Sequence, residues 1–189
     1  MKVTSRETYK VVRGVLELRE FTQSELSRKE KVTFSLVNRV VNWLVSRGYV
    51  ARRKNGYALV AAAGVFNLFP IYRQMVPWKM FEVDARPKHV LELLEGKATL
   101  CLSSALPYYD DYFRDPAIYA YADDEKLAVE LAQLRKGFTR VELYRNDLDA
   151  GDSVVKNGLR VTGKVRTVVD LFCANKAYAA ERLVKREWG

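Results

Sequence analysis

Polar side chains recur at three- and four-residue intervals in the stretch from residue 35 to residue 46. They are Ser35, Asn38, Arg39 and Asn42. This spacing places them on one face of a helix. Hydroxyl, amide and guanidinium groups on such a face can donate to phosphates or pair with base edges in the major groove of DNA. The pattern therefore predicts a DNA-reading helix in which these four residues contact the groove and its bases.

A basic cluster follows this helix at Arg52, Arg53 and Lys54, directly before Asn55-Gly56. The strand-like runs YVARRK and YALV flank the Asn-Gly pair. Asn-Gly between two such runs predicts a β-hairpin with a type I′ turn, in which both residues take positive φ. Cations beside a tight turn can contact the DNA backbone, so we assign these three residues to phosphates.

Three predicted helices position these groups. The first covers residues 5–20, and Ser24 predicts the N-cap of a short second helix that ends near residues 29–31. The third begins at Thr33 or Ser35 and ends before Gly48, which suits a C′ position. Its apolar stripe is formed by Leu36, Val37, Val40, Val41 and Leu44. Three helices followed by a basic hairpin predict a winged helix-turn-helix domain.

Almost all of the excess positive charge lies in the first 60 residues. They hold 13 Lys and Arg against 5 acidic residues, whereas the remaining 129 residues hold 19 basic and 18 acidic ones. The two parts therefore carry net charges of +8 and +1, which make up the +9 of the whole chain. Charge concentrated in one segment favours binding of that segment to a polyanion.

The run VNRVVNWLVSRGYVAR, from Val37 to Arg52, resembles the helix and hairpin of MarR-like regulators. The resemblance implies a winged-helix domain that binds double-stranded DNA. It agrees with the assignment made above from residue types and charge.

Residues 61–78, AAAGVFNLFPIYRQMVPW, contain one charged residue and are broken by Pro70 and Pro77. We predict one helix up to about Phe69 and a second short helix up to Met75, which together link two domains. Winged-helix proteins often dimerise through a helix added next to the wing. A homodimer formed through this segment is therefore a hypothesis, which sedimentation would test.

Strand and helix patterns alternate from residue 79 to residue 189 and predict a mixed α/β domain. Strands are predicted at 80–85, 117–122, 138–145 and 158–161. Residues 138–145, FTRVELYR, alternate as a half-buried strand does. Helices are predicted after Pro87, after a cap at Ser103 or Ser104, after Asp123 or Asp124, and twice in the last 26 residues.

A second resemblance lies in this region. The segments SSALPYYD (103–110), VELYR (141–145) and GLRVTGKVRTVVDLF (158–172) resemble the C-terminal domain of AbiEi-type antitoxins. These are transcriptional regulators of abortive-infection toxin–antitoxin systems, and they also begin with a winged helix. The resemblance implies an autoregulating repressor with a cognate toxin as a protein partner.

The RTVVDL run also indicates a structural role. Thr162 is predicted to cap a helix on which Arg166 and Asp170 are four residues apart and can pair directly. We favour a structural ion pair for Arg166 and Asp170 over a role in holding a toxin.

Acidic residues raise an alternative, a metal-dependent nuclease. The nearest sequence matches, Glu82-Val83-Asp84 and Asp124-Glu125-Lys126, lack the required spacing, and Asp147-Leu148-Asp149 lacks the upstream Gly-Ser of a nucleotidyltransferase. With one histidine and no glycine-rich phosphate loop, we predict no enzymatic activity, no metal and no cofactor. A repressor that senses a small ligand is a further alternative.

Cys101 and Cys173 stand in apolar contexts and predict buried free thiols. No run approaches the roughly 18 apolar residues of a membrane span, so we expect a cytoplasmic protein without a membrane partner. The predicted fold is α+β. It consists of a winged helix-turn-helix at 1–60, apolar linker helices at 61–78 and a C-terminal mixed α/β domain at 79–189.

Overall fold

The computed structural model of the chain describes residues 1–149 and 151–189. The fold is mixed α+β and divides into two compact units. The first unit comprises Met1–Arg73 and Val184–Gly189, and the second comprises Gln74–Leu183. Within the described ranges, the chain has no helix with the length and apolar character needed to cross a bilayer.

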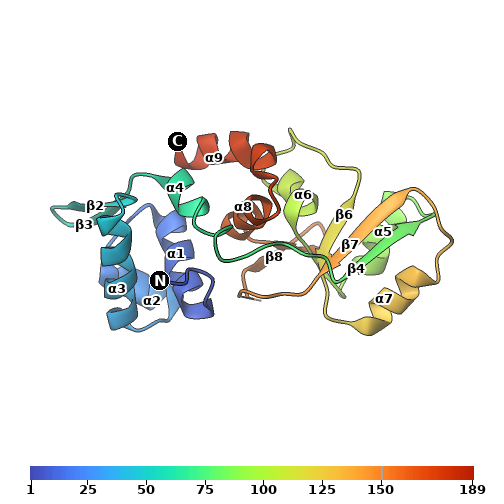
Figure 1. Cartoon of the computed structure of the whole chain (residues 1–189), viewed down its shortest axis with the longest axis horizontal. Helices are drawn as coiled ribbons and strands as arrows, with labels where there is room; N and C mark the ends of the chain where they lie inside the picture. Colours follow the sequence, from blue (N-terminus) through green and yellow to red (C-terminus); the bar gives the residue numbers. More distant parts are fainter. Residues whose placement is uncertain (150) are drawn as a thin grey trace. The chain divides into compact units, whose positions relative to one another are not determined.

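The first unit contains helices and a small antiparallel sheet (Figure 1). Its helices are α1 (Arg6–Leu18), α2 (Gln23–Glu30), α3 (Phe34–Ser46) and α4 (Ala62–Phe66). Its strands are β1 (Glu20–Phe21), β2 (Val50–Arg53) and β3 (Gly56–Leu59), paired in the order β1-β3-β2. The three predicted helices and the hairpin are confirmed. The sequence does not predict β1, because two residues at the end of a helix show no strand periodicity.

The apolar stripe of α3 lies in the core of this unit. Its buried side chains are Val37, Val40, Val41 and Leu44. Leu36 belongs to the predicted stripe but is only partly buried. The last residues of α9 (Glu181–Trp188) complete this core: the Trp188 indole donates to the Leu16 carbonyl at 2.7 Å, and its ring packs edge-on against Phe66 at 5.2 Å.

Helix α2 begins two residues earlier than the sequence prediction. Its N-cap is Thr22, not Ser24, and Thr22 forms a capping box with Glu25. A capping box satisfies two otherwise unpaired backbone N–H groups, whereas a single cap satisfies one, which explains why the earlier start is preferred. Helix α3 is capped by Thr33 and ends at Ser46, before Gly48 as predicted, and the φ of Gly48 is 72°.

The hairpin between β2 and β3 is confirmed, but its predicted turn is wrong. Arg53 pairs with Gly56, so the two turn residues are Lys54 and Asn55, and Asn55 does not have positive φ. Gly56 has a φ of 148° and starts β3. A Cβ atom at Gly56 would lie 2.5 Å from the Phe21 carbonyl oxygen. Glycine is therefore required here because β1 approaches closely, not because of the turn.

The apolar segment 61–78 contains one helix instead of the two predicted. Helix α4 ends at Phe66, and residues 67–78 form turns and extended chain. Pro70 and Pro77 remove backbone donors on both sides of the second predicted helix, which leaves too few residues for a stable helical nucleus. Within the first unit, Phe69 packs edge-on against Tyr9 at 6.0 Å.

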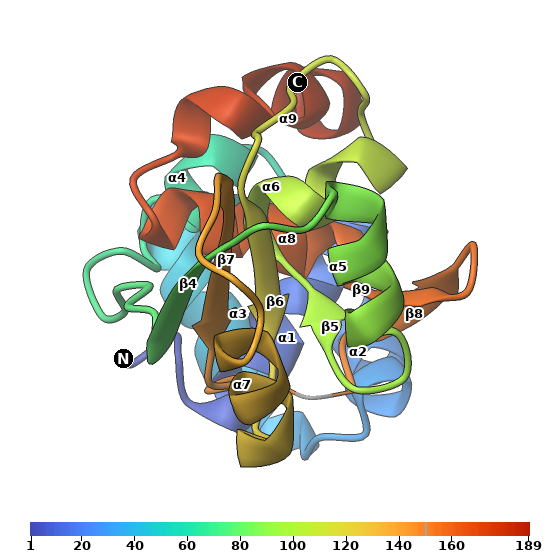
Figure 2. The ribbon, with the colours of Figure 1, turned by 90° about the vertical axis from the view of Figure 1, so that its right-hand side faces the viewer.

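The second unit is built on a six-stranded mixed sheet with strand order β4-β7-β6-β5-β9-β8 (Figure 2). The strands are β4 (Lys79–Val83), β5 (Thr99–Leu100), β6 (Ile118–Tyr121), β7 (Thr139–Tyr144), β8 (Ser153–Lys156) and β9 (Leu159–Thr162). The helices are α5 (Pro87–Leu94), α6 (Leu102–Ala105), η1 (Leu106–Tyr108), α7 (Glu125–Ala132), α8 (Lys164–Cys173) and η2 (Ala177–Ala180), followed by the start of α9.

Both faces of this sheet are covered. Helices α5 and α7 lie over one face and α8 over the other (Figures 1 and 2). The face under α5 and α7 is apolar and includes Ile118, Ala120, Val141 and Leu143. Residues 141–144 of β7 are all buried, so the prediction of a half-buried strand is wrong. Among the polar positions of its alternating pattern, Glu142 and Tyr144 are buried on the other side of the sheet, whereas Arg140 is exposed.

Two predicted caps in this unit are also wrong. Helix α6 begins after Cys101, so Ser103 and Ser104 lie inside it. Ser104 instead accepts from the Tyr119 backbone N–H at 2.9 Å. Helix α8 begins after Gly163, and the hydroxyl of Thr162 contacts that of Thr167 at 2.8 Å. These hydroxyls form hydrogen bonds with polar groups of other elements that are removed from water. The local sequence does not show which of those groups need a partner. The predicted burial of free Cys101 and Cys173 is confirmed.

The two Asn-Gly pairs of the chain provide a stability test. Asn157 lies in the β8–β9 turn with a φ of 51°, whereas Asn55 does not have positive φ. Alanine tolerates the left-handed region poorly, so Asn157→Ala should lower the free energy of unfolding by about 1 kcal/mol. Asn55→Ala should change it by less than about 0.5 kcal/mol. Urea titrations followed by circular dichroism measure both, and equal losses would contradict the two turn geometries.

Candidate nucleic-acid interface

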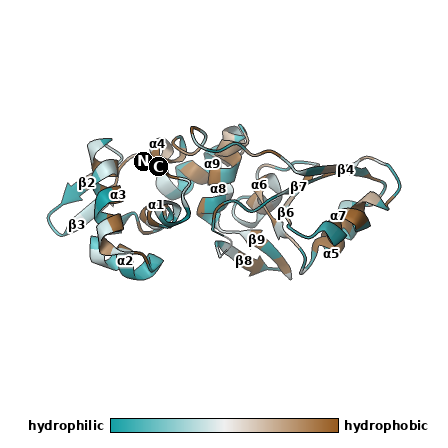
Figure 3. Cartoon of the chain, turned by 60° about the horizontal axis from the view of Figure 1, so that its bottom comes forward, coloured by the Kyte–Doolittle hydropathy of each residue, from teal (hydrophilic) through white to brown (hydrophobic). Residues whose placement is uncertain are grey.

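Helix α3 presents the predicted polar face. Ser35, Asn38 and Arg39 are exposed and Asn42 is half-buried, while the opposite face of the helix is in the core. The helix thus separates its polar and apolar residues as the sequence predicts. Helix α2 of the same unit is hydrophilic, as is the β2 strand toward the end of the hairpin (Figure 3).

A hydrogen-bonded network joins this face to α2 and to the hairpin. The Asn42 side-chain amide donates to the Asn38 side-chain oxygen Oδ1 at 2.5 Å, and Gln23 donates to the same oxygen at 3.3 Å. Arg52 donates to the Asn42 side-chain oxygen Oδ1 at 3.0 Å, and Gln23 also donates to the Tyr57 hydroxyl at 3.0 Å. The network therefore restrains side chains from α2, α3, β2 and β3 in one arrangement.

The three predicted phosphate contacts differ in their surroundings. Arg52, Arg53 and Lys54 are all exposed. Arg52 is held by Asn42, so it links the hairpin to α3. Within residues 1–149 and 151–189, Arg53 and Lys54 form no hydrogen bond or ion pair, and Arg39 forms none either. The donors of Arg39, Arg53 and Lys54 are therefore available to an external anion.

Sequence reasoning missed Gln23, Tyr57 and Phe34. Gln23 enters the network because α2 starts after Thr22, so the Thr22–Glu25 capping box was the available signal. Phe34 is the first residue of α3 and its exposed fraction is 52%. An exposed phenylalanine beside a polar helix face suits an apolar contact with a thymine methyl group.

One basic residue of the first unit is occupied inside the protein. Arg13 on α1 pairs with Glu30 on α2, whose carboxylate is almost fully buried. Burial raises the pKa of Glu30, and the neighbouring Arg13 opposes this shift. Arg13 therefore neutralises a buried acid and seats α2 against α1.

In the second unit, Arg166 and Asp170 form a buried ion pair. The Arg166 Nε donates to Asp170 at 2.8 Å, and their side chains are 1% and 0% exposed. Arg166 also donates to the Tyr121 hydroxyl at 2.8 Å and to Asp147 at 3.2 Å. Burial of both partners places the pair out of reach of another molecule in this arrangement, which is the geometry of a structural role.

A second polar cluster lies between β6 and the end of α8. The Lys176 ammonium donates to Asp115 at 2.9 Å and to the Tyr119 hydroxyl at 2.6 Å. Ser103 donates to the same Asp115 oxygen at 3.1 Å, and Tyr119 donates to it at 3.0 Å. Burial alone would raise the pKa of Asp115, but hydrogen bonds from Lys176, from the Ala117 backbone N–H and from Tyr119 lower it below 3.8.

The described residues contain no group of three or more His, Cys, Asp or Glu side chains placed to hold a metal ion. Comparison of the chain with known proteins found no match among protein-family models, curated proteins or solved structures.

The buried ion pair predicts a large mutational effect. Arg166→Met leaves Asp170 as an uncompensated buried charge and should lower the free energy of unfolding by about 3–5 kcal/mol. Lys97 provides the control, because its pair with Glu130 is exposed on both sides at 41% and 42%. Lys97→Ala should cost less than about 1 kcal/mol. Similar losses in urea titrations of the two variants would show that burial does not decide the contribution of the pair.

The lowered pKa of Asp115 predicts a pH-dependent contribution to stability. A carboxyl whose pKa is lower in the folded state stabilises the protein above its unfolded value, and this contribution is lost as the pH falls through the folded value. Asp115→Asn should therefore destabilise the protein most above about pH 5, and the difference from wild type should shrink below 3.8. Urea titrations between about pH 3 and 7 test this. A difference that does not vary with pH would contradict it.

Proposed function

We propose that the chain is a sequence-specific, double-stranded DNA-binding regulator that acts without catalysis. Its first unit is proposed to be a winged helix-turn-helix, with α3 in the major groove and the β2–β3 hairpin along the backbone. The observation that carries the proposal is the polar face of α3, fixed by the network that runs from Gln23 to Arg52.

The chemistry of this face supports a division of roles. Asn38, Asn42 and Arg39 carry the amide and guanidinium groups that pair with adenine and guanine edges. Arg53 and Lys54 sit at the turn of the hairpin, where cations contribute charge without base specificity. Side chains held by hydrogen bonds before binding lose less conformational entropy on binding, which favours a fixed register.

The proposal extends to a protein partner. The motifs of the second unit resemble AbiEi-type antitoxins, which supports an autoregulating antitoxin whose partner is a toxin. Arg166 and Asp170 of the RTVVDL run are buried, so a partner would contact other residues of the unit. Homodimerisation through segment 61–78 is a separate part of the proposal, tested by sedimentation at micromolar concentration.

Two substitutions separate base reading from phosphate binding. Arg39→Ala should cost roughly 1–3 kcal/mol on the specific duplex if Arg39 pairs with a guanine, and much less on a scrambled duplex. Arg53→Ala should weaken both duplexes alike and reduce the slope of log K against log salt by about 1.

Fluorescence anisotropy with both duplexes over a salt series measures these effects. Lys97→Ala, in the second unit, is the matched control for loss of a surface charge and should leave both affinities unchanged. If Arg39→Ala and Arg53→Ala both bind like wild type, the assigned face is wrong.

A further inference from the structure

The covered face of the sheet opposite α5 and α7 is polar. Arg140, Glu142 and Tyr144 alternate along β7 with the apolar residues Val141 and Leu143. In the parallel register between β6 and β7, Tyr119 pairs with Glu142 and Tyr121 with Tyr144. Neighbouring residues in register share a face, so these tyrosines extend the polar layer across two strands. Burying polar side chains in such a layer costs free energy unless they are hydrogen-bonded.

A cavity of about 350 Å³ opens on this layer. Its polar lining consists of Tyr119, Arg140, Glu142, Tyr144 and Lys176, and apolar walls come from other residues that include Met75, Pro77 and Leu102. All of these residues belong to the second unit. The volume lies at the lower end of the range of small-molecule sites, and mixed lining with a few convergent polar groups is typical of them.

The hydrogen bonds of the cavity leave donors unused. Lys176 uses two of the three N–H donors of an ammonium group, on Asp115 and Tyr119. Glu142 accepts from the Tyr144 hydroxyl at 2.5 Å on one oxygen and forms an ion pair with Arg140 at 2.6 Å through the other. Arg140 is 53% exposed and forms, within the described chain, no ion pair other than the one with Glu142, so the rest of its guanidinium is available.

We propose that this cavity binds a small organic carboxylate, whose oxygens accept from Lys176 and Arg140 and whose apolar body lies against Met75, Pro77 and Leu102. Lys176 and Arg140 have unused N–H donors, whereas the oxygens of Glu142 are already occupied. A complementary ligand therefore supplies acceptor oxygens. The planar guanidinium matches a carboxylate in geometry.

Charge selects a monoanion over a phosphate dianion. The two cations of the cavity are opposed by Glu142 in its wall and by Asp115 behind Lys176. The charges of these four groups sum to zero, so the site disfavours a dianion more strongly than a monoanion. The apolar wall adds a preference for a carboxylate that carries a hydrocarbon or aromatic group.

The protonation states agree with this site. Burial lowers the pKa of Lys176, but its bonds to Tyr119 and Asp115 outweigh burial and raise the pKa above 10.5, so the ammonium stays charged at neutral pH. Burial and the bond to Glu142 raise the pKa of Tyr144, which keeps its hydroxyl protonated as a donor to Glu142.

The test is isothermal titration of the full chain with four probes: hexanoate, benzoate, benzamide as the uncharged analogue of benzoate, and inorganic phosphate. At least one of the two carboxylates should bind wild type, and neither benzamide nor phosphate should bind as tightly. Arg140→Gln, which keeps a donor toward Glu142 but removes the charge, should weaken carboxylate binding by about tenfold or more.

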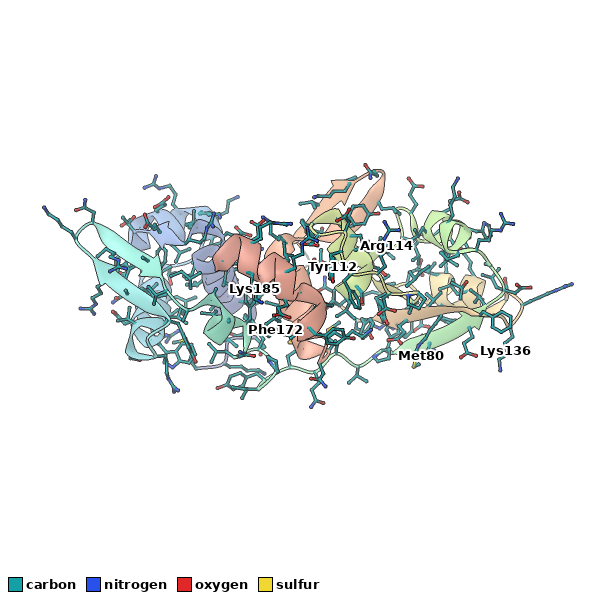
Figure 4. The ribbon with its side chains drawn as sticks, turned by 90° about the horizontal axis from the view of Figure 1, so that it is seen from above. Met80, Tyr112, Arg114, Lys136, Phe172 and Lys185 are labelled. Atoms are coloured by element: carbon teal, nitrogen blue, oxygen red, sulfur yellow. The ribbon has the colours of Figure 1, made fainter. Side chains whose placement is uncertain are left out.

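Lys136→Gln is the matched control. Lys136 is an exposed cation that lines a different hollow, along the β4 edge of the sheet near Met80 (Figure 4). Arg140 also borders that hollow, so Lys136→Gln is needed to tell the two sites apart. Carboxylate binding should be unchanged in this variant. The proposal is overturned if no carboxylate binds at millimolar concentration, if benzamide or phosphate binds as well as the carboxylate, or if Arg140→Gln binds like wild type. Weakened binding in Lys136→Gln would assign the ligand to the other hollow and also overturn it.

Discussion

The proposed interface depends on the hydrogen bond between Arg52 of the hairpin and Asn42 of α3. A helix that enters a groove and a hairpin that follows the backbone act together only if their relative position is fixed. The core holds the inner face of α3, and the Arg52–Asn42 bond continues this restraint on the outer face. Because Asn42 also binds Asn38, the restraint reaches the side chains proposed to contact bases. Arg52 is thus proposed to position the interface, while Arg53 and Lys54 supply its unpaired charge.

In the second unit, polar side chains lie on a sheet that is covered on both faces, so those that are buried need partners within the protein. One face is packed by an apolar cluster, and on the other side of the sheet the buried charges of Glu142, Asp170 and Asp115 each have a partner. The pairs differ in access. Arg166 and Asp170 are fully buried, whereas the side chains of Arg140 and Lys176 are partly exposed and border a cavity. This difference separates the structural ion pair from the proposed carboxylate site.

Local patterns predicted most elements because the features that define them are local. The apolar stripe of α3, the stop at Gly48 and the strand at 138–145 follow from the spacing of side chains along the chain. The two Asn-Gly pairs show that the same local pattern can predict a turn correctly at one place and wrongly at another. Asn157-Gly158 forms the expected turn with φ of 51° and 82°, whereas the turn at Asn55 is shifted by one residue and Gly56 lies in β3, where β1 approaches it closely. That approach involves a strand 35 residues away, which no local pattern contains.

The candidate sites also contain features that the local sequence predicts and features that depend on contacts between elements. The exposed face of α3 could be predicted, because amphipathic spacing identifies the side that faces water. Gln23 and Tyr57 could not, because they join the face through contacts between elements. The polar layer of the second unit was missed for a related reason. Alternation in FTRVELYR indicates two different faces, but not that Glu142 and Tyr144 on the polar one are buried.

The most direct test of the account is a gel-shift titration of the full chain against the DNA upstream of its own coding sequence, in EDTA and over a series of salt concentrations. The account predicts tight binding that survives unrelated competitor DNA, weakens steeply with salt and needs no divalent metal. Absence of binding to this or any other duplex would contradict it, and the first unit would then be a scaffold for contacts with protein.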